Sequence, residues 1–354
     1  MPNLRRTSGR LAAALLITAT AASLAGCGSD DADADSGNSS KPVTLRLGYF
    51  PNLTHATAIV GVEDGHFAKA LGKNKLKTQT FNAGPEATQA LLSGALDATY
   101  IGPGPSTNAY AKSGGEAVRV ISGATSGGAA LVVKPEITSV EDLKGKKIAS
   151  PQLGNTQDIA LRSYLKEKGL ETTQEGGGDV SIVPQENSQT VDTFATGTID
   201  GAWVPEPYLS RLVNEGGKVL VDERTLWPEG KFVTTNLLVR TDFLQQHPDV
   251  VKALLEGQVA ANQSVNDDPA NAQMVVGAAI GKLTGKPLDP ELVAQAWKTL
   301  TFTDDPLPAT LITGAEHATD VGLLDKVDNL EGIYDLKLLN EVLKAHGLSE
   351  VEQP

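Results

Sequence analysis

The sequence has few of the residues that build covalent or metal-based sites. Of its 354 residues one is cysteine, Cys27, and five are histidine. A single cysteine cannot form a disulfide within the chain, and a cysteine nucleophile is not expected. Four histidines (His66, His247, His317 and His346) are scattered without the spacing of metal ligands. We therefore predict no metal site and no cofactor.

Positive charge and catalytic motifs are also scarce. The chain carries 30 Lys and Arg against 43 Asp and Glu, a net charge of −13 at pH 7. A nucleic-acid partner is not expected, because phosphate binding needs a basic surface. HExxH, GxSxG, Walker A and GxGxxG motifs are missing. The sequence predicts binding without catalysis, and no catalytic residue is assigned.

The first 27 residues differ from the rest of the chain. Three arginines precede an apolar stretch, 11–24, which is short for a membrane span, and the segment ends Leu-Ala-Gly-Cys. Small residues before a cysteine resemble a bacterial lipobox. We expect a lipoprotein signal peptide over 1–27, lipidation of Cys27 and a location on the extracytoplasmic face of the cell membrane. The alternative is a plain secreted protein with an incidental cysteine.

Residues 28–42 are acidic and of low complexity. They lack the spacing and distal glutamate of a calcium-binding EF-hand loop. We interpret them as a disordered, solvated tether between the membrane and the folded part of the chain.

From residue 43 onward, strand-like and helix-like stretches alternate. Apolar and polar residues alternate over 43–49, as in a strand, and further strands are expected at about 75–81, 97–101 and 118–122. Helices are expected between them, at about 85–93 and 105–112. This order predicts an α/β fold with a mostly parallel sheet.

The pattern is repeated at an offset of 103 residues. SGALD at 93–97 corresponds to TGTID at 196–200, and the same offset carries Asn52 onto Asn155. We interpret this as a duplicated α/β lobe. The prediction is lobe I from 43–130 plus 240–354 and lobe II from 131–239. Two apolar stretches, 129–133 and 235–240, are expected to cross between the lobes, with a cleft between them.

Loops rich in glycine, proline and hydroxyl groups follow the expected strands. Ligands of open α/β sheets bind beyond the carboxyl ends of the strands, where helix starts offer free N–H groups that favour oxyanions. We predict that these loops bind a small organic anion such as a sulfonate. The predicted contacts are Asn52, Thr54, Gly84, Pro105, Ser106, Thr125, Ser126, Gly154, Asn155 and Thr156. Capping is the alternative, because Asn155 with Asp158 resembles a helix cap.

Two further candidates lie in WVPEPY at 203–208. Trp203 is predicted to form an aromatic wall, and Glu206 to meet a cationic end of the ligand or to orient a neighbouring donor. The alternatives are a core tryptophan and a surface acid. His55 is a weaker candidate.

Several motifs together resemble the aliphatic sulfonate-binding proteins of ABC importers, a group related to nitrate-, taurine- and thiamine-precursor-binding proteins. The motifs are LGYFPNLTHATAIVG at 47–61, GNTQD at 154–158 and WVPEP at 203–207, and the resemblance covers about 43–265. It implies a two-lobed, type II-like periplasmic-binding-protein clamshell with two β-strand crossovers. Where many members carry glutamine, this chain has Phe50, which removes a polar contact.

The resemblance also implies a function. A protein of this group is a monomer that captures a small organic anion and delivers it to an ABC-type membrane permease. The loops at Asn52, Gly84, Pro105, Ser126 and Thr156, with Trp203, would then line the cleft. Three alternatives remain: a nitrate, taurine or thiamine-precursor ligand; a receptor that signals to a membrane kinase; and a pyrimidine-forming or hydrolytic enzyme that requires His55 or His66.

Overall fold

The computed structural model describes residues 41–354. The predicted signal peptide, Cys27 and all but the last two residues of the predicted tether lie outside the described residues. Residues 42–354 form one compact unit. Over 41–354, every helix is too short or too polar to cross a lipid bilayer.

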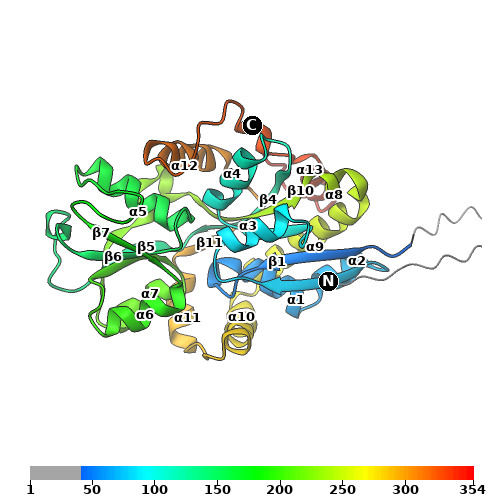
Figure 1. Ribbon diagram of the computed structural model, residues 1–354. Helices are drawn as coiled ribbons and strands as arrows, with labels where there is room; N and C mark the ends of the chain where they lie inside the picture. The colour runs from blue at the N-terminus through cyan, green and yellow to red at the C-terminus, as the bar shows by residue number, and fades with distance from the viewer. Residues whose placement is uncertain (1–40) are drawn as a thin grey trace, which may run out of the picture. The chain divides into compact units, whose positions relative to one another are not determined.

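The described chain contains two β-sheets, which Figure 1 shows at its right (sheet A) and left (sheet B). Sheet A has the order β11-β4-β10-β3-β1-β2, and sheet B the order β7-β6-β8-β5-β9. The strands of sheet A are β1 (Thr44–Tyr49), β2 (Lys75–Thr80), β3 (Ala98–Ile101), β4 (Val118–Gly127), β10 (Val233–Arg240) and β11 (Leu300–Phe302). Those of sheet B are β5 (Ala129–Val133), β6 (Lys147–Pro151), β7 (Ser181–Gln185), β8 (Gly201–Pro205) and β9 (Lys218–Asp222).

The chain passes between the sheets twice. It first passes from β4 to β5 through Gly128, and Gly127 and Gly128 adopt φ values of +81° and +75°, a backbone region that favours glycine. It returns from β9 to β10 through the 3₁₀ turns η3 (Glu223–Leu226) and η4 (Pro228–Gly230). Both crossings therefore lie a few residues before the predicted stretches, which belong to β5 and β10. The division into two lobes stays a prediction.

Helices cover both sheets. Around sheet A lie η1 (Leu53–His55), α1 (Ala56–Glu63), α2 (His66–Leu71), α3 (Gly84–Leu92), α4 (Pro103–Lys112), α8 (Thr241–Gln246), α9 (Pro248–Asp267), α10 (Pro269–Thr284), α11 (Pro290–Trp297) and α13 (Lys337–Ala345). Sheet B carries η2 (Glu141–Leu143), α5 (Thr156–Glu167), α6 (Asn187–Ala195) and α7 (Tyr208–Asn214), and η5 (Glu331–Ile333) precedes α13. Proline opens α4, α9, α10 and α11, where its missing N–H removes no helical hydrogen bond.

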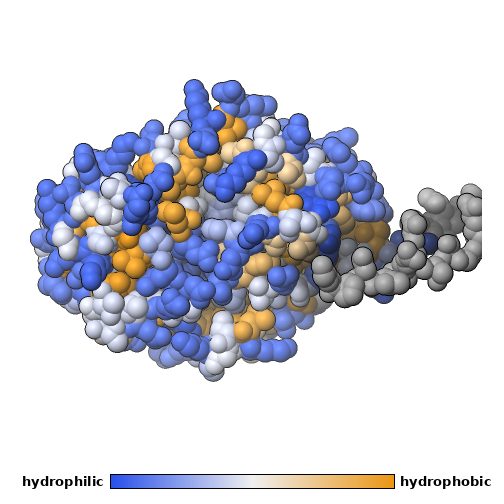
Figure 2. All heavy atoms as spheres, in the orientation of Figure 1, coloured by the Kyte–Doolittle hydropathy of each residue, from blue (hydrophilic) through white to orange (hydrophobic). Residues whose placement is uncertain are grey.

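Helix α12 (Pro308–Asp320) packs on helices of both sheets, α4 and α5, and lies across the top of Figure 1. Ile159 of α5 is buried against Ala315 and Ala318 of α12. The C-terminal part of the chain, which the sequence predicts to belong to lobe I, thus also contacts α5, a helix of sheet B. In the orientation of Figure 1, the visible surface in Figure 2 consists mainly of hydrophilic residues, with apolar residues in separate groups.

Candidate functional site

A cavity of about 330 Å³ lies where loops of the two sheets meet. Sheet A contributes the loops after β1 and β2, and sheet B contributes the loops after β7 and β8. The end of α10 closes one side. The lining residues are Pro51, Asn52, Thr80, Phe81, Asn82, Glu86, Glu186, Asn187, Ser188, Tyr208, Leu283 and Thr284.

Two helices, α3 from sheet A and α6 from sheet B, begin at this cavity. Their N-cap residues, Ala83 and Glu186, make no side-chain capping hydrogen bond. The first N–H groups of a helix have no partner within the helix, and the helix dipole adds partial positive charge there. The two helix starts therefore supply N–H donors suited to an oxyanion.

Asn187, the first residue of α6, was missed by the sequence prediction. Its side chain is 6% exposed, and its Oδ1 has no hydrogen-bond partner. A buried polar atom without a partner destabilises the fold and calls for an explanation. The sequence did contain a signal, because the 103-residue offset that relates Asn52 to Asn155 also relates Gly84 to Asn187.

Of the predicted contacts, Asn52 lines the cavity, and its side chain does not cap η1. Thr125 Oγ1 donates to the carbonyl oxygen of Thr54 at 2.7 Å. Gly84 packs against Pro105, since a Cβ on Gly84 would lie 2.1 Å from Pro105 Cγ. These contacts fix the loops of sheet A near the cavity.

Two predicted serines bond within the protein. Ser106 Oγ donates to the Gly102 carbonyl at 2.9 Å and accepts from Asn236 Nδ2 at 3.0 Å. Ser126 Oγ accepts from the Phe232 N–H at 3.2 Å. Both hydroxyls hold backbone segments of sheet A in place. A ligand contact at either residue stays a prediction.

The start of α5 is capped by its own side chains. Asn155 Oδ1 accepts from the Thr156 N–H at 2.7 Å. Asp158 accepts from the Gly154 N–H at 3.0 Å and from Ser150 Oγ at 2.5 Å, and it pairs with the buried Arg162 at 3.1 Å. These contacts are the ones that the capping interpretation expects. Ligand binding by Gly154, Asn155 and Thr156 stays a prediction.

Three side-chain contacts join the loops of the two sheets. The Gly104 N–H donates to Thr156 Oγ1 at 3.3 Å, Asn82 Nδ2 donates to Glu186 Oε1 at 3.2 Å, and Gln152 Nε2 donates to Glu86 Oε1 at 3.3 Å. Thr156 fits here because Gly102 has no side chain: a Cβ on Gly102 would lie 2.3 Å from Thr156 Oγ1.

Trp203 lies in the core of sheet B and does not line the cavity. Its indole N–H donates to Glu223 at 2.7 Å, and its ring meets Tyr164 edge-on at 5.6 Å. Glu206 is fully buried and accepts from the N–H and the hydroxyl of Ser210 at 3.1 and 2.9 Å. Burial raises the pKa of Glu206 to about 7, and that of Glu223 likewise to about 7.

His55 is buried, and its ring lies 4.4 Å from that of Phe50. Its Nδ1 accepts from the Phe50 N–H at 3.3 Å. Burial lowers the pKa of His55 to about 3, so the ring is neutral at physiological pH. The ring therefore serves as a hydrogen-bond acceptor for the loop after β1.

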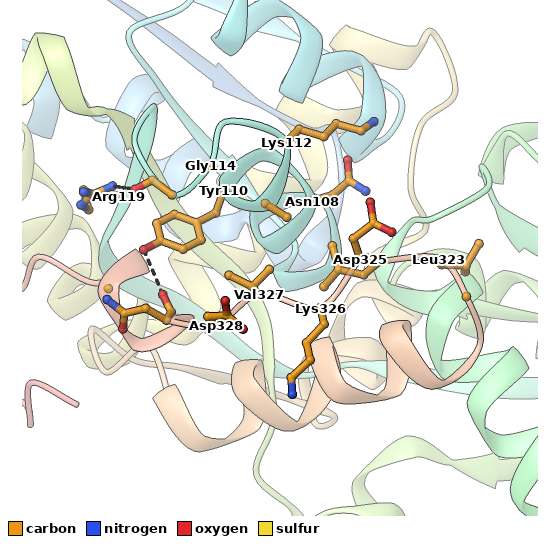
Figure 3. A pocket seen from close by; sticks show the side chains of 16 residues that line it. Asn108, Tyr110, Lys112, Gly114, Arg119, Leu323, Asp325, Lys326, Val327 and Asp328 are labelled. Carbon is orange, nitrogen blue, oxygen red and sulfur yellow. Dashed lines mark hydrogen bonds between the residues drawn. The ribbon is translucent and has the colours of Figure 1, made fainter.

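A larger groove of about 780 Å³ lies between α4 and the segment after α12. Figure 3 shows Tyr110 beside it, with the Tyr110 hydroxyl donating to the Asn329 carbonyl at 3.1 Å. It contains none of the predicted contacts. Within residues 41–354, no group of three His, Cys, Asp or Glu side chains is placed to hold a metal.

A family model, described as the NMT1-like family, matches residues 38–280. The chain belongs to the NMT1-like family. Among its relatives is the taurine-binding periplasmic protein of Escherichia coli (strain K12), 32% identical over 212 residues, which are 60% of this chain and 64% of the relative. The match thus spans slightly less than two thirds of that protein's length.

Two further comparisons agree with the assignment of this chain to the NMT1-like family. The putative aliphatic sulfonates-binding protein of Bacillus subtilis (strain 168) is 28% identical over 242 residues, 66% of this chain and 68% of the relative. The structure of the alkanesulfonate-binding protein SsuA from Xanthomonas axonopodis pv. citri, bound to MOPS, matches with a TM-score of 0.70 at 20% identity, covering 84% of this chain and 100% of that chain. The predicted family and periplasmic-binding-protein fold are confirmed.

Proposed function

We propose that this protein is an extracytoplasmic solute-binding protein that captures a small organic anion, an aliphatic sulfonate, and delivers it to the permease of an ABC importer. The observation that carries the proposal is the cavity at the uncapped starts of α3 and α6. One helix belongs to each sheet, so one anion can accept N–H groups from both. The names of the taurine- and sulfonate-binding relatives support the ligand class.

Capture then depends on a change in the angle between the sheets. A ligand that contacts both helix starts only when the sheets approach stabilises the closed form. The two crossings, at Gly127–Gly128 and at residues 223–232, are the connections about which the sheets turn. We propose that the remaining predicted contacts support this site. They are Thr54, Gly84, Pro105, Ser106, Thr125, Ser126, Gly154, Asn155, Thr156, Trp203 and Glu206.

We further propose that Cys27 is lipidated and holds the protein on the membrane. The lipobox-like Leu-Ala-Gly-Cys segment supports this. Mass spectrometry of the protein from its native membrane should find a diacylglyceryl group on Cys27. A Cys27→Ala chain should be recovered in the soluble fraction, and its persistence in washed membranes would contradict the proposal.

Calorimetric unfolding with a panel of alkanesulfonates, taurine, nitrate and sulfate tests the ligand class. A true ligand at 100 times its Kd should add about 2.7 kcal/mol to the free energy of unfolding. The exposed Ser188 lines the cavity, so Ser188→Phe should abolish the effect by filling it. Gln189→Phe, at the next exposed position of α6, is the control. A panel without any stabilising sulfonate overturns the sulfonate assignment.

A further inference from the structure

We infer that a second pocket, separate from the cavity, binds a small organic cation of the quaternary ammonium class, with the Glu223 carboxylate as its counter-charge. This α5–α12 pocket has a volume of about 260 Å³ and lies between α5, the turns η3 and η4, and α12. Among the described residues, none lines both the pocket and the cavity. Figure 1 shows α12 at its top, whereas α10, which borders the cavity, lies at its bottom. The inference is therefore independent of the proposed function.

Glu223 brings a negative charge to the wall of this pocket. Its side chain is 2% exposed, and its carboxylate accepts from the indole N–H groups of Trp203, at 2.7 Å, and of Trp227. Both partners are neutral, and the charge that acts on Glu223 is that of Asp222, a second carboxylate. Burial, together with Asp222, raises the pKa of Glu223 to about 7, because a buried carboxylate without a cation is costly to ionise. A cation bound in the pocket would offset that cost.

The protein supplies no such cation from the pocket wall. In the described part of the chain, neither lysine nor arginine lines the pocket. Lys168 lies outside the lining, 5.4 Å from the centre of the Tyr164 ring, and its ammonium group pairs with Glu167 at 2.9 Å. Both members of that pair are exposed to solvent, so their charges are screened and largely cancel. The Glu223 charge is thus left for a ligand to balance.

Most of the pocket wall is aromatic or apolar. Tyr164, Trp227 and His317 contribute rings, and the ring centres of Trp227 and His317 lie 5.8 Å apart. Aromatic rings attract cations, and quaternary ammonium groups are recognised by such rings. A quaternary ammonium group donates no hydrogen bond, which suits a carboxylate that already accepts from two indoles. The volume of the pocket accommodates a trimethylammonium group on a short chain.

Titration calorimetry at pH 8.5, above the Glu223 pKa of about 7, compares choline with its neutral isostere 3,3-dimethylbutan-1-ol. The two probes have nearly the same shape and differ by one charge. We expect choline to bind at least tenfold more tightly, a difference of about 1.4 kcal/mol. Equal affinities would mean that the pocket ignores charge and would overturn the inference. Failure of choline to bind would overturn it too, and in both cases solute capture in the cavity would stand.

Matched variants test the role of the carboxylate. Glu223→Gln keeps an acceptor for the indoles and removes the charge, so the preference for choline should fall below about threefold, 0.6 kcal/mol. Glu229→Gln removes an exposed charge of η4, outside the pocket, and should leave the preference unchanged. Equal losses in the two variants would overturn the assignment to Glu223.

Two further variants locate the bound cation without changing a buried group. Ala309→Phe, at an exposed position of the pocket wall on α12, should abolish choline binding by filling the pocket. Ser188→Phe fills the cavity and should leave choline binding unchanged. The opposite pattern would place choline in the cavity and overturn the inference.

Discussion

Sheets A and B follow one plan, and in each a parallel core of three strands is joined by a strand that arrives from the other sheet. The parallel strands β2-β1-β3 of sheet A correspond to β7-β6-β8 of sheet B. The next place is taken by β10 in sheet A and by β5 in sheet B, both antiparallel to their neighbours. The two sheets therefore exchange equivalent strands.

The correspondence extends to single hydrogen bonds. Asp97 accepts from the Arg46 N–H at 2.8 Å, and Asp200 accepts from the Lys147 N–H at 2.8 Å. The electrostatics differ at the helix starts. Asp158 gives the start of α5 a carboxylate, whereas its counterpart in the repeat, His55, is neutral. A duplicated backbone therefore does not imply duplicated binding chemistry.

The largest expected difference between the sheets concerns their aspartates. Asp97 is buried and also pairs with the Arg46 guanidinium, whereas Asp200 is partly exposed and has no such pair among its hydrogen bonds. We expect Asp97→Ala to cost about 2–4 kcal/mol and Asp200→Ala about 1 kcal/mol of unfolding free energy. Urea unfolding followed by circular dichroism measures both. Equal losses of unfolding free energy in the two variants would contradict the expected difference between the two aspartates.

The next prediction is a pH dependence in sheet B. The pKa of Glu206 is about 7 in the folded protein, above its ordinary value of 4.5, so the folded state binds the proton more tightly. Its contribution to stability is present below about pH 4.5 and is lost as the pH rises to 7. Relative to wild type, Glu206→Gln should gain about 1–3 kcal/mol between pH 5 and pH 8. Glu215→Gln, exposed near the end of α7, is the control and should gain nothing.

A third prediction concerns Gly102, which lies at the contact of Thr156 with the loop after β3. Gly102→Ala would place a Cβ 2.3 Å from Thr156 Oγ1, so it should hinder closure and weaken solute binding about tenfold. Removing the hydroxyl and methyl groups with Thr156→Ala in the same chain should restore part of the affinity. Titration calorimetry of the wild type, Gly102→Ala and the double variant decides. A double variant as weak as Gly102→Ala would show that the clash is not the cause.

A small effect on stability is expected at Asn155. Its side chain accepts from the Thr156 N–H, so Asn155→Ala should cost about 1 kcal/mol of stability through a lost helix cap. If the residue also contacts the solute, the Kd should rise more than tenfold. Urea unfolding and titration on the same sample separate the two roles.

The local elements were predictable because periodicity and turn residues are local signals. The strands expected at 75–81 and 97–101 are β2 and β3, and the helix expected at 85–93 is α3. The crossing points were not predictable from the residues of β5 and β10, which read AALVV and VTTNLLVR. Their membership of a sheet depends on pairing with strands distant in sequence, such as β10 with β3.

The candidate site was harder to predict for a related reason. Trp203 and Glu206 were recognisable as unusual residues, but burial among distant neighbours decides what they contact. The partner of the Trp203 indole, Glu223, is 20 residues away and carries no motif. Asn187 was detectable only by carrying the repeat through every loop, because its unpaired atom is a property of packing.

The Glu223 carboxylate accepts hydrogen bonds from two of the three tryptophans of the chain, Trp203 and Trp227. The segment between Glu223 and Trp227 is the one by which the chain leaves sheet B for sheet A. The third tryptophan, Trp297, packs on Phe302 of β11, the edge strand of sheet A that pairs with β4 up to Gly127. The intrinsic tryptophan fluorescence of the protein is therefore expected to change when this return segment changes its conformation. Closure of the protein can then be followed by tryptophan fluorescence, without an attached dye.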